Sequence, residues 1–460
     1  MATTAPRPLS TPTSPLTASA TDGHRPRRAP RLPGFAAAGG TLALVGIVAA
    51  MALLALTTAA APSSVVPKSS ARFFPSWLSG PLHGLGPSAS IGAIVALVLV
   101  VCACYAIALR CAEALSVRRL CVAIALAHLA GALAPPLFSG DLFGYIGYAR
   151  LAVLHDLSPY VHGVGAAPHD AIYPLVGWPS LTTPYGPLFT LLTEALVPLG
   201  IAGSLWALKA LAALASLATV ALIWRIAART GRSPRAAIAF YGLNPLVLVF
   251  AIPGAHNEAL IGLLVAAGAA WLLTGSQARG AGALVAASAI KASSALVLPF
   301  ALLGAPHARR GRTAAAIVLA LVAAAAVTLV AFGANLSALG GALLTQQNLV
   351  AGHSLPSEVS KLLGLGKLAL GVRVAFLVML GGVFAAMLRR GWRGASWLDC
   401  YGWTALALLA ATAWLWPWYG LWALLPASVS SSRRLRVATL LACAYLVAIR
   451  VAIHHPLSAA

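Results

Sequence analysis

Acidic residues are scarce in this sequence. Asp and Glu number nine in 460 residues, against 31 Lys and Arg, and charged residues make up only 9% of the chain. A water-soluble chain carries far more charge, whereas 60% hydrophobic residues are typical of an integral membrane protein. The net charge of +22 lies mostly in short basic loops between apolar runs, where it sets membrane orientation. We therefore expect no nucleic-acid partner.

Several motifs that define soluble enzymes are also missing. The sequence has no Walker loop, no dinucleotide fingerprint and no evident Ser-His-Asp arrangement. Its six cysteines show neither zinc spacing nor a disulfide framework. They are expected to be buried packing residues: Cys102, Cys104, Cys111, Cys121, Cys400 and Cys443. The sequence thus predicts no cofactor and no metal site, with a divalent cation left open.

Long apolar runs dominate the rest of the chain. Runs of about 17–25 residues can cross a ~30 Å hydrocarbon core as helices, and these runs are apolar on all sides, unlike the strands of a membrane barrel. The sequence therefore predicts an all-α polytopic membrane protein. The alternation of basic and poorly charged loops gives spans near residues 36–60, 89–111, 119–137, 204–225, 236–252, 257–274, 313–333, 368–388, 396–414, 416–430 and 437–453.

The apolar run 281–304 breaks this alternation, because basic loops flank it on both sides. Two short helices that meet at Lys291 restore the alternation, each rising roughly 16–20 Å at ~1.5 Å per residue. With this hairpin the chain has about thirteen transmembrane helices, with the N-terminus in the cytoplasm and the C-terminus outside. We expect a multi-pass protein of the plasma membrane.

The same alternation divides the chain into parts. Residues 1–34 are expected to be a disordered basic cytoplasmic tail, 35–455 the membrane domain and 456–460 an extracytoplasmic tail. Within the membrane domain, residues 138–203 form one long extracytoplasmic loop. Residues 186–200 are apolar but contain an acid, so we expect an amphipathic helix that lies at the outer interface.

Asp141 opens this outer loop and is the main candidate for chemistry. If a helix starts at Gly140, then Asp141, Tyr145 and Tyr148 share one face at i, i+4 and i+7. An acid in the first turn complements the helix dipole, which is a purely structural role. The functional alternative is a general base at the membrane surface. Arg150 lies opposite Asp141 on such a helix, and either reaches lipid phosphates or holds a ligand phosphate.

Aromatic residues mark further candidate positions on the outer side. Two Pro-Tyr units place Tyr160 and Tyr185 in rigid turns, where the rings suit sugar contacts or the aromatic belt of the interface. The aromatic stretch AWLWPWYGLW contains Trp418 and Tyr419 at an outer boundary. This stretch either anchors the protein at the interface or lines a groove for a polyprenyl chain.

Polar residues within apolar surroundings form the last group of candidates. His256, Asn257 and Glu258 are adjacent at the outer end of a predicted span. Polar groups there cost free energy unless they have hydrogen-bond partners or serve a function. Lys291 is an ionisable residue inside an apolar run and suits a lipid-linked phosphate as a point charge. An outward-facing enzyme without access to nucleotides needs a donor carried by the membrane.

Five motifs in order resemble one family. GDLFGYIGYARL…SPYVHG, TPYGPLF, GAHNEALIGLLVAAG, AIKASSALVLPF and WPWY are similar to the actinobacterial polyprenol-phosphate-mannose-dependent α-1,6-mannosyltransferases of lipomannan synthesis, within the GT-C glycosyltransferases. The likeness covers roughly residues 35–450. It implies a GT-C-like helical bundle and inverting transfer of a sugar, mannose in this family, from a polyprenyl-phosphate donor. The implied acceptor is a hydroxyl of an extracytoplasmic glycolipid or lipoglycan.

The resemblance also implies roles for single residues. Asp141 matches the loop acid of the family and is implied as the catalytic base. His256 and Lys291 match polar positions around the donor phosphate, and we expect Lys291, with His256 or Arg150, to steady the charge on the leaving polyprenyl phosphate.

Two positions depart from the family pattern. Glu258 stands where the family usually carries Asp, and Tyr148-Ala149-Arg150 replaces an Ala-Gln-Gly element. The acceptor, the linkage and the sugar therefore stay open, and a different lipid-linked hexose or pentose is an alternative.

A transporter or flippase for a lipid-linked sugar is the alternative function. Transporters often contain interrupted helices near the bilayer midplane, which the 281–304 segment partly matches. However, the sequence shows no second hairpin and no convincing internal repeat. Transport also has no need for a long acid-bearing outer loop, so the sequence favours the enzyme.

Overall fold

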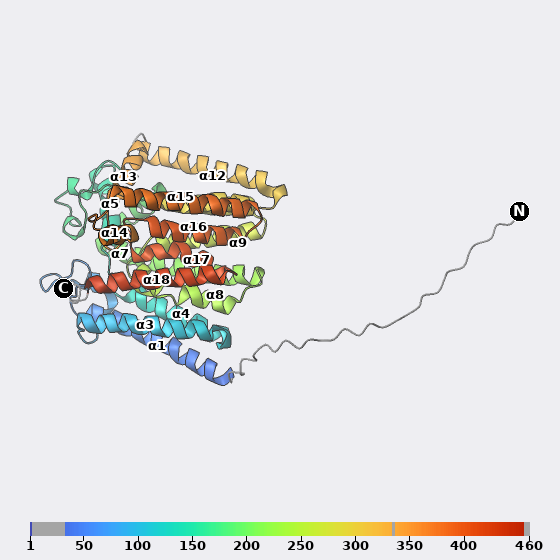
Figure 1. Ribbon diagram of the computed structural model, residues 1–460. Coiled ribbons are helices and arrows are strands. Elements are labelled where there is room, and N and C mark those ends of the chain that lie inside the picture. The colour runs from blue at the N-terminus through green and yellow to red at the C-terminus, as the bar shows by residue number, and fades with distance from the viewer. Residues whose placement is uncertain (2–32, 334–335, 455–460) are drawn as a thin grey trace.

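The computed structural model describes Met1, residues 33–333 and residues 336–454, and it is helical throughout these parts (Figure 1). An isolated antiparallel bridge joins Ser70 and Phe73. The two tails predicted at 1–34 and 456–460 lie almost entirely outside the described residues. The all-α prediction is confirmed.

The α-helices follow one another with short connections. In chain order they are α1 (Pro33–Ala60), α2 (Ser76–Ser79), α3 (Ile91–Cys111), α4 (Val117–Leu133), α5 (Asp141–His155), α6 (Pro187–Glu194), α7 (Gly200–Arg229), α8 (Pro234–Gly242), α9 (Glu258–Leu273), α10 (Gln277–Ile290), α11 (Val297–Gly304), α12 (His307–Phe332), α13 (Leu336–Asn348), α14 (Leu355–Leu362), α15 (Leu370–Trp392), α16 (Trp397–Ala411), α17 (Leu421–Val429) and α18 (Arg433–His454). A π-helix at Leu246–Ala251 follows α8.

Serine side chains begin several of these helices. The Oγ atoms of Ser90, Ser116 and Ser233 each accept a hydrogen bond from the backbone N–H three residues later, at the starts of α3, α4 and α8. Ser354 and Ser396 do the same for α14 and α16. Such a cap satisfies one of the free N–H groups in the first helical turn. The sequence itself thus sets these helix starts.

Five helical segments of the described chain are long and apolar enough to cross a membrane. They are Gly34–Ala60, Ile91–Ala114, Pro187–Arg229, His307–Phe332 and Leu370–Trp392. The other predicted spans correspond to shorter or less apolar helices. The count of about thirteen crossings and the orientation of the chain therefore stay predictions.

The segment 281–304 is interrupted at Lys291, as predicted. α10 ends one residue earlier, Lys291 is extended (φ −153°, ψ 124°), and a 3₁₀ turn then leads into α11. Thr313, near the start of α12, donates a hydrogen bond of 2.7 Å to Gln277 at the start of α10. Since α12 follows directly on α11, both ends of this hairpin lie at one end of the bundle and Lys291 lies toward the other.

The centre of the bundle is formed by α8, the π-helix and α17, whose residues are almost all buried. In Figure 1, α1 and α3 lie at one side of the bundle, and α12 and α15 lie at the opposite side. The outer helices α12 and α15 bury only 6% of their most apolar stretches within the protein. Such exposed apolar helices suit contact with lipid.

The prediction that all cysteines are buried is only partly correct. Cys400 and Cys443 are buried and Cys102, Cys104 and Cys111 are half-buried, but Cys121 is exposed. Cys121 lies on the outward face of α4, next to the exposed Val122. A cysteine in an apolar run can therefore lie on a lipid-facing surface as well as in the packed interior.

Candidate active site

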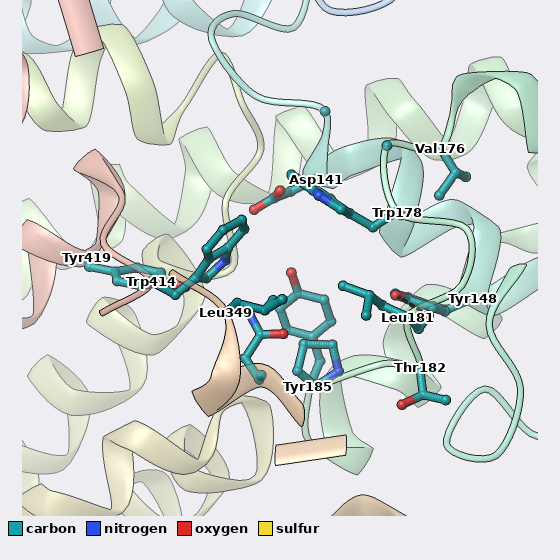
Figure 2. Close-up of a pocket in the computed structure, with 15 residues that line it drawn as sticks. Asp141, Tyr148, Val176, Trp178, Leu181, Thr182, Tyr185, Leu349, Trp414 and Tyr419 are labelled. Atoms are coloured by element: carbon teal, nitrogen blue, oxygen red, sulfur yellow. Dashed lines mark hydrogen bonds between the residues drawn. The ribbon is translucent and has the colours of Figure 1, made fainter. Parts of the chain in front are cut away.

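Asp141 is the first residue of α5, the helix that the sequence predicted to start at Gly140. Its backbone N–H donates a hydrogen bond of 3.2 Å to Oγ of Ser139, which fixes the helix start. Its side chain is only 16% exposed. The carboxylate lies at the wall of a small cavity of about 50 Å³, where its oxygens face the same space as the hydroxyl of Tyr185 (Figure 2).

The predicted companions of Asp141 lie on its side of α5. Tyr148 lines the same cavity and donates a hydrogen bond of 2.9 Å to the carbonyl oxygen of Leu181. Tyr145 is buried beneath the cavity, with its ring edge-on to that of Tyr185 at 4.9 Å. The i, i+4, i+7 spacing thus places both tyrosines as expected.

His256 reaches Asp141 from the turn before α9. Its Nδ1 lies 3.7 Å from Oδ2 of Asp141 and 3.5 Å from the hydroxyl of Tyr145. The imidazole ring is fully buried and stacks on the ring of Trp418, with centroids 3.6 Å apart. Its Nε2 has no hydrogen-bond partner among the described residues. Trp418 therefore fixes the plane of a ring that faces the acid.

Lys291 approaches from the interrupted hairpin. Its Nζ lies 2.6 Å from Oε1 of Glu258, the residue that starts α9. The same ammonium group lies 4.2 Å from the ring centroid of Tyr419 and 5.5 Å from that of Trp422. A buried cation with a carboxylate partner and two aromatic faces is stabilised in its charged form.

A second, larger cavity adjoins the first. It has a volume of about 460 Å³, and Lys291 is one of the residues that line it. Its apolar wall comes from α13, α15 and α16, for example Leu343, Leu377 and Leu408. The two cavities share the five lining residues Pro184, Tyr185, Gln346, Trp414 and Tyr419. Asp141 and Lys291 thus lie on two adjoining chambers with a common aromatic boundary.

Burial sets the electrostatics of this region. It raises the pKa of Asp141 from 3.8 to about 6, and the nearby charge of Lys291 partly opposes the rise. Burial also lowers the pKa of His256 well below its ordinary value, helped by the positive charges of Lys291 and Arg450. His256 is therefore neutral near pH 7, and Asp141 is a weakly basic carboxylate poised to exchange a proton.

Arg150 does not reach these cavities. Its Nε and a terminal nitrogen donate hydrogen bonds of 2.8 and 3.1 Å to the two carboxylate oxygens of Asp170, and His155 lies 2.8 Å from the same acid. Although burial opposes it, these bonds and the N–H of Ile172 lower the pKa of Asp170. The structure therefore places Arg150 in an ion pair that ties α5 to a later part of the outer loop, at Asp170.

Two other predicted residues lie behind the cavities. Tyr160 is buried and its hydroxyl bonds Thr190 at 3.0 Å and the carbonyl of Tyr185 at 3.2 Å, which supports the loop before α6. Asn257 is buried next to His256, and its side-chain amide has no hydrogen-bond partner among the described residues. Both are placed to support the residues that line the site.

Several residues at the site were missed by the sequence reasoning. Lys209 is fully buried and donates hydrogen bonds of 2.9 Å to the carbonyl of Pro253 and 3.3 Å to that of Gly131. Arg450 donates to the carbonyl of Phe138, and its guanidinium lies 5.0 Å from the ring of Trp416. Both are cations within apolar helices, the signal that singled out Lys291.

Gln346 and Arg373 were also missed, whereas Trp414 belongs to the aromatic stretch AWLWPWYGLW that the sequence singled out. All three line the larger cavity, from α13, α15 and the turn after α16. Gln346 lies in an ordinary polar stretch, but Arg373 is a cation within an apolar run, the same signal as for Lys209 and Arg450. Their role depends on how separate helices come together.

Comparison with known proteins supplies an independent finding. Residues 43–307 match the family described as "Alpha-(1->6)-mannopyranosyltransferase, N-terminal domain". The chain is 32% identical over 230 residues to Alpha-(1->6)-mannopyranosyltransferase A of Mycobacterium tuberculosis, a stretch that covers 48% of this chain and 44% of the relative. It is 30% identical over 176 residues to the enzyme of the same name from Corynebacterium glutamicum, covering 36% of this chain and 35% of the relative. The chain thus matches less than half the length of either relative.

Proposed function

The chain belongs to the α-(1→6)-mannopyranosyltransferase family, and we propose that it transfers mannose from a polyprenyl-phosphate donor to a hydroxyl of a glycolipid or lipoglycan acceptor. The reaction inverts the anomeric carbon, with Asp141 as the general base. The observation that carries the proposal is the arrangement of the two chambers. One presents a carboxylate beside aromatic rings, and the other joins a cation to an apolar volume.

The larger chamber suits the donor. A polyprenyl chain needs apolar walls, and the cavity of about 460 Å³ has them along α13, α15 and α16. The phosphate needs a cation, and Lys291 lines this chamber beside Tyr419, which borders both chambers. A donor placed in this way directs its sugar toward Tyr185 and Tyr419, which border both chambers.

The smaller chamber suits the sugar and the acceptor hydroxyl. Tyr148, Tyr185, Trp414 and Tyr419 line it and offer flat faces and hydroxyl groups for sugar binding. The Asp141 carboxylate takes the proton of the acceptor hydroxyl as that oxygen bonds to the anomeric carbon. The bond between the anomeric carbon and the phosphate oxygen breaks at the same time, and its electron pair stays with the polyprenyl phosphate.

The leaving phosphate gains negative charge in this step. The ammonium group of Lys291 stabilises that charge more strongly than the charge of the bound donor. When no donor is bound, Glu258 pairs with the ammonium group of Lys291 and keeps it oriented. His256, whose ring stacks on Trp418, lies beside Asp141 on the other side. This scheme uses no metal ion, because the donor arrives as an activated phosphate ester.

The proposal includes a location. The membrane domain of 35–455 has its N-terminus in the cytoplasm, and the loop of 138–203 carries Asp141 on the outer side of the plasma membrane. A lipid-linked donor then reaches the site from within the bilayer.

One experiment tests this function. The full-length protein in detergent is incubated with polyprenyl-phosphate mannose and candidate mannolipid acceptors, and the product linkage is determined. We expect an α-1,6-linked product, and no product from a nucleotide sugar. Because detergent leaves no sealed compartment, transfer under these conditions also separates the enzyme from a transporter or flippase. Failure of every polyprenyl-phosphate donor would overturn the proposal.

A further inference from the structure

A groove runs between α10 and α12. Helix α12 lies on the side of the molecule away from α1 (Figure 1). One part, of about 730 Å³, is lined by residues near the starts of the two helices, including Gln277, Arg309 and Arg312. A second part, of about 290 Å³, continues toward their other ends and reaches Val327. Ala320 lines both parts, so they form one groove along α12.

Small side chains keep this groove open. Its wall includes Gly282 and Ala286 from α10 and Ala316 and Ala324 from α12. From Arg312 to Val327 the groove extends for roughly 22 Å at ~1.5 Å per residue. This length exceeds the ~15 Å of one leaflet of the hydrocarbon core. The groove is therefore long enough to hold an extended acyl chain.

Two arginines stand at the head of the groove. The guanidinium groups of Arg309 and Arg312 have no hydrogen-bond or ion-pair partner among the described residues, and no acid lines the groove there. Arg309 folds against Gly275, since a Cβ atom on that glycine would lie 2.6 Å from its NH1 atom. It thus spans from α12 to the turn before α10.

The neighbouring Arg310 is different. It donates hydrogen bonds to the carbonyl oxygens of Ala305 and Leu303 at 3.2 and 3.0 Å, and it lies 5.3 Å from the ring of Trp392. The protein therefore uses Arg310 for its own structure and leaves the exposed guanidinium groups of Arg309 and Arg312 at the groove without a protein partner.

We propose that this groove binds one anionic phospholipid, with its phosphate at Arg309 and Arg312 and an acyl chain along α10 and α12. Guanidinium groups match phosphate oxygens in charge and geometry, and basic pockets between membrane helices suit anionic headgroups. The arginine end of the groove is separate from the candidate active site, because α10 places about 21 Å between Gln277 and Lys291. The inference does not depend on the proposed function.

The test measures lipid retained by the purified full-length protein. The protein is exchanged into mixed micelles with phosphatidylglycerol or phosphatidylcholine of identical acyl chains, and bound lipid is counted by native mass spectrometry. We expect one tightly held phosphatidylglycerol and roughly tenfold weaker retention of phosphatidylcholine. Equal retention of the two lipids would overturn the proposal.

Variants locate the lipid. Arg309→Gln with Arg312→Gln should lose the phosphatidylglycerol. The control Arg229→Gln with Arg232→Gln, at the end of α7 and in the loop after it, should keep it. Ala320→Phe fills the groove while both arginines stay, and should lose it too. An unchanged unfolding temperature shows that each variant is folded. Retention by both groove variants contradicts the proposal.

A competition arm separates a lipid headgroup from a free phosphate. Inorganic phosphate at the same concentration should leave the bound phosphatidylglycerol in place, because it gains nothing from the apolar groove. Complete displacement by inorganic phosphate would show a simple anion site and overturn the lipid assignment.

Discussion

The side chains of His256 and Asp141 meet, although one precedes α9 and the other starts α5: Nδ1 of His256 lies 3.7 Å from Oδ2 of Asp141. The imidazole is neutral, because burial lowers its pKa. A neutral imidazole adds no positive charge beside the carboxylate. Burial of Asp141 itself raises its pKa to about 6, although the charge of Lys291 opposes the rise, and this value suits a general base.

The pH dependence of transfer follows from this value. Asp141 acts as a base only when ionised, so kcat should fall about tenfold per pH unit below pH 6 and level off above pH 7. Initial rates between pH 4.5 and 8 measure this. The Arg150–Asp170 pair stays ionised over this range because the pKa of Asp170 is lowered. A rate that is flat down to pH 4.5 would contradict the assignment of the base.

Lys291→Met should reduce kcat by about 10²–10³, because the leaving phosphate loses its cation. The substitution also leaves Glu258 buried without its partner, which destabilises the fold. The matched control is Lys291→Met with Glu258→Gln, which removes both charges. We expect the double variant to regain its unfolding temperature but not its activity; recovered transfer would show that Lys291 serves only the fold.

Arg150→Met should lower the stability of the protein by about 3 kcal/mol, since it leaves the buried Asp170 carboxylate without its bidentate partner. Thermal unfolding in detergent measures the loss, with the exposed Arg232→Met as control. The KM for the donor should stay the same in the fraction that remains folded. A raised donor KM at unchanged stability would instead support a phosphate-binding role for Arg150.

Lys209→Met should lower the rate of mannose transfer indirectly, because Lys209 helps to position His256. The lysine holds the carbonyl of Pro253, three residues before His256, so its loss frees the turn that carries the imidazole. If it acts in this way, Lys209→Met with His256→Ala should be no slower than His256→Ala alone. If the two substitutions instead lower the rate additively, Lys209 and His256 act independently, which contradicts this positioning role.

Much of the site was predictable because each signal was local. The scarcity of acids directed attention to Asp141, and helical spacing placed Tyr145 and Tyr148 beside it. Lys291 was identified as a charge in an apolar run, and the alternation of basic loops required a hairpin tip there. In each case a few neighbouring residues carried the information.

The remaining features depend on long-range packing. The pairing of Lys291 with Glu258 joins the 281–304 hairpin to the start of α9, and that of Arg150 with Asp170 joins two distant parts of the outer loop. The stacking of His256 on Trp418 brings together α9 and the turn before α17. No spacing rule encodes such pairs, because they arise only when the helices pack. For this reason Arg150 was predicted as a phosphate ligand, although it lies in an ion pair.

The most direct test of the account compares the wild-type protein with Asp141→Asn. Both are purified in detergent and supplied with polyprenyl-phosphate mannose and a mannolipid acceptor, and initial rates of transfer are measured. The amide keeps the shape of the side chain but cannot take the acceptor proton, so we expect transfer to fall about 10³-fold or more at an unchanged unfolding temperature. Transfer by Asp141→Asn at close to the wild-type rate would contradict the central claim.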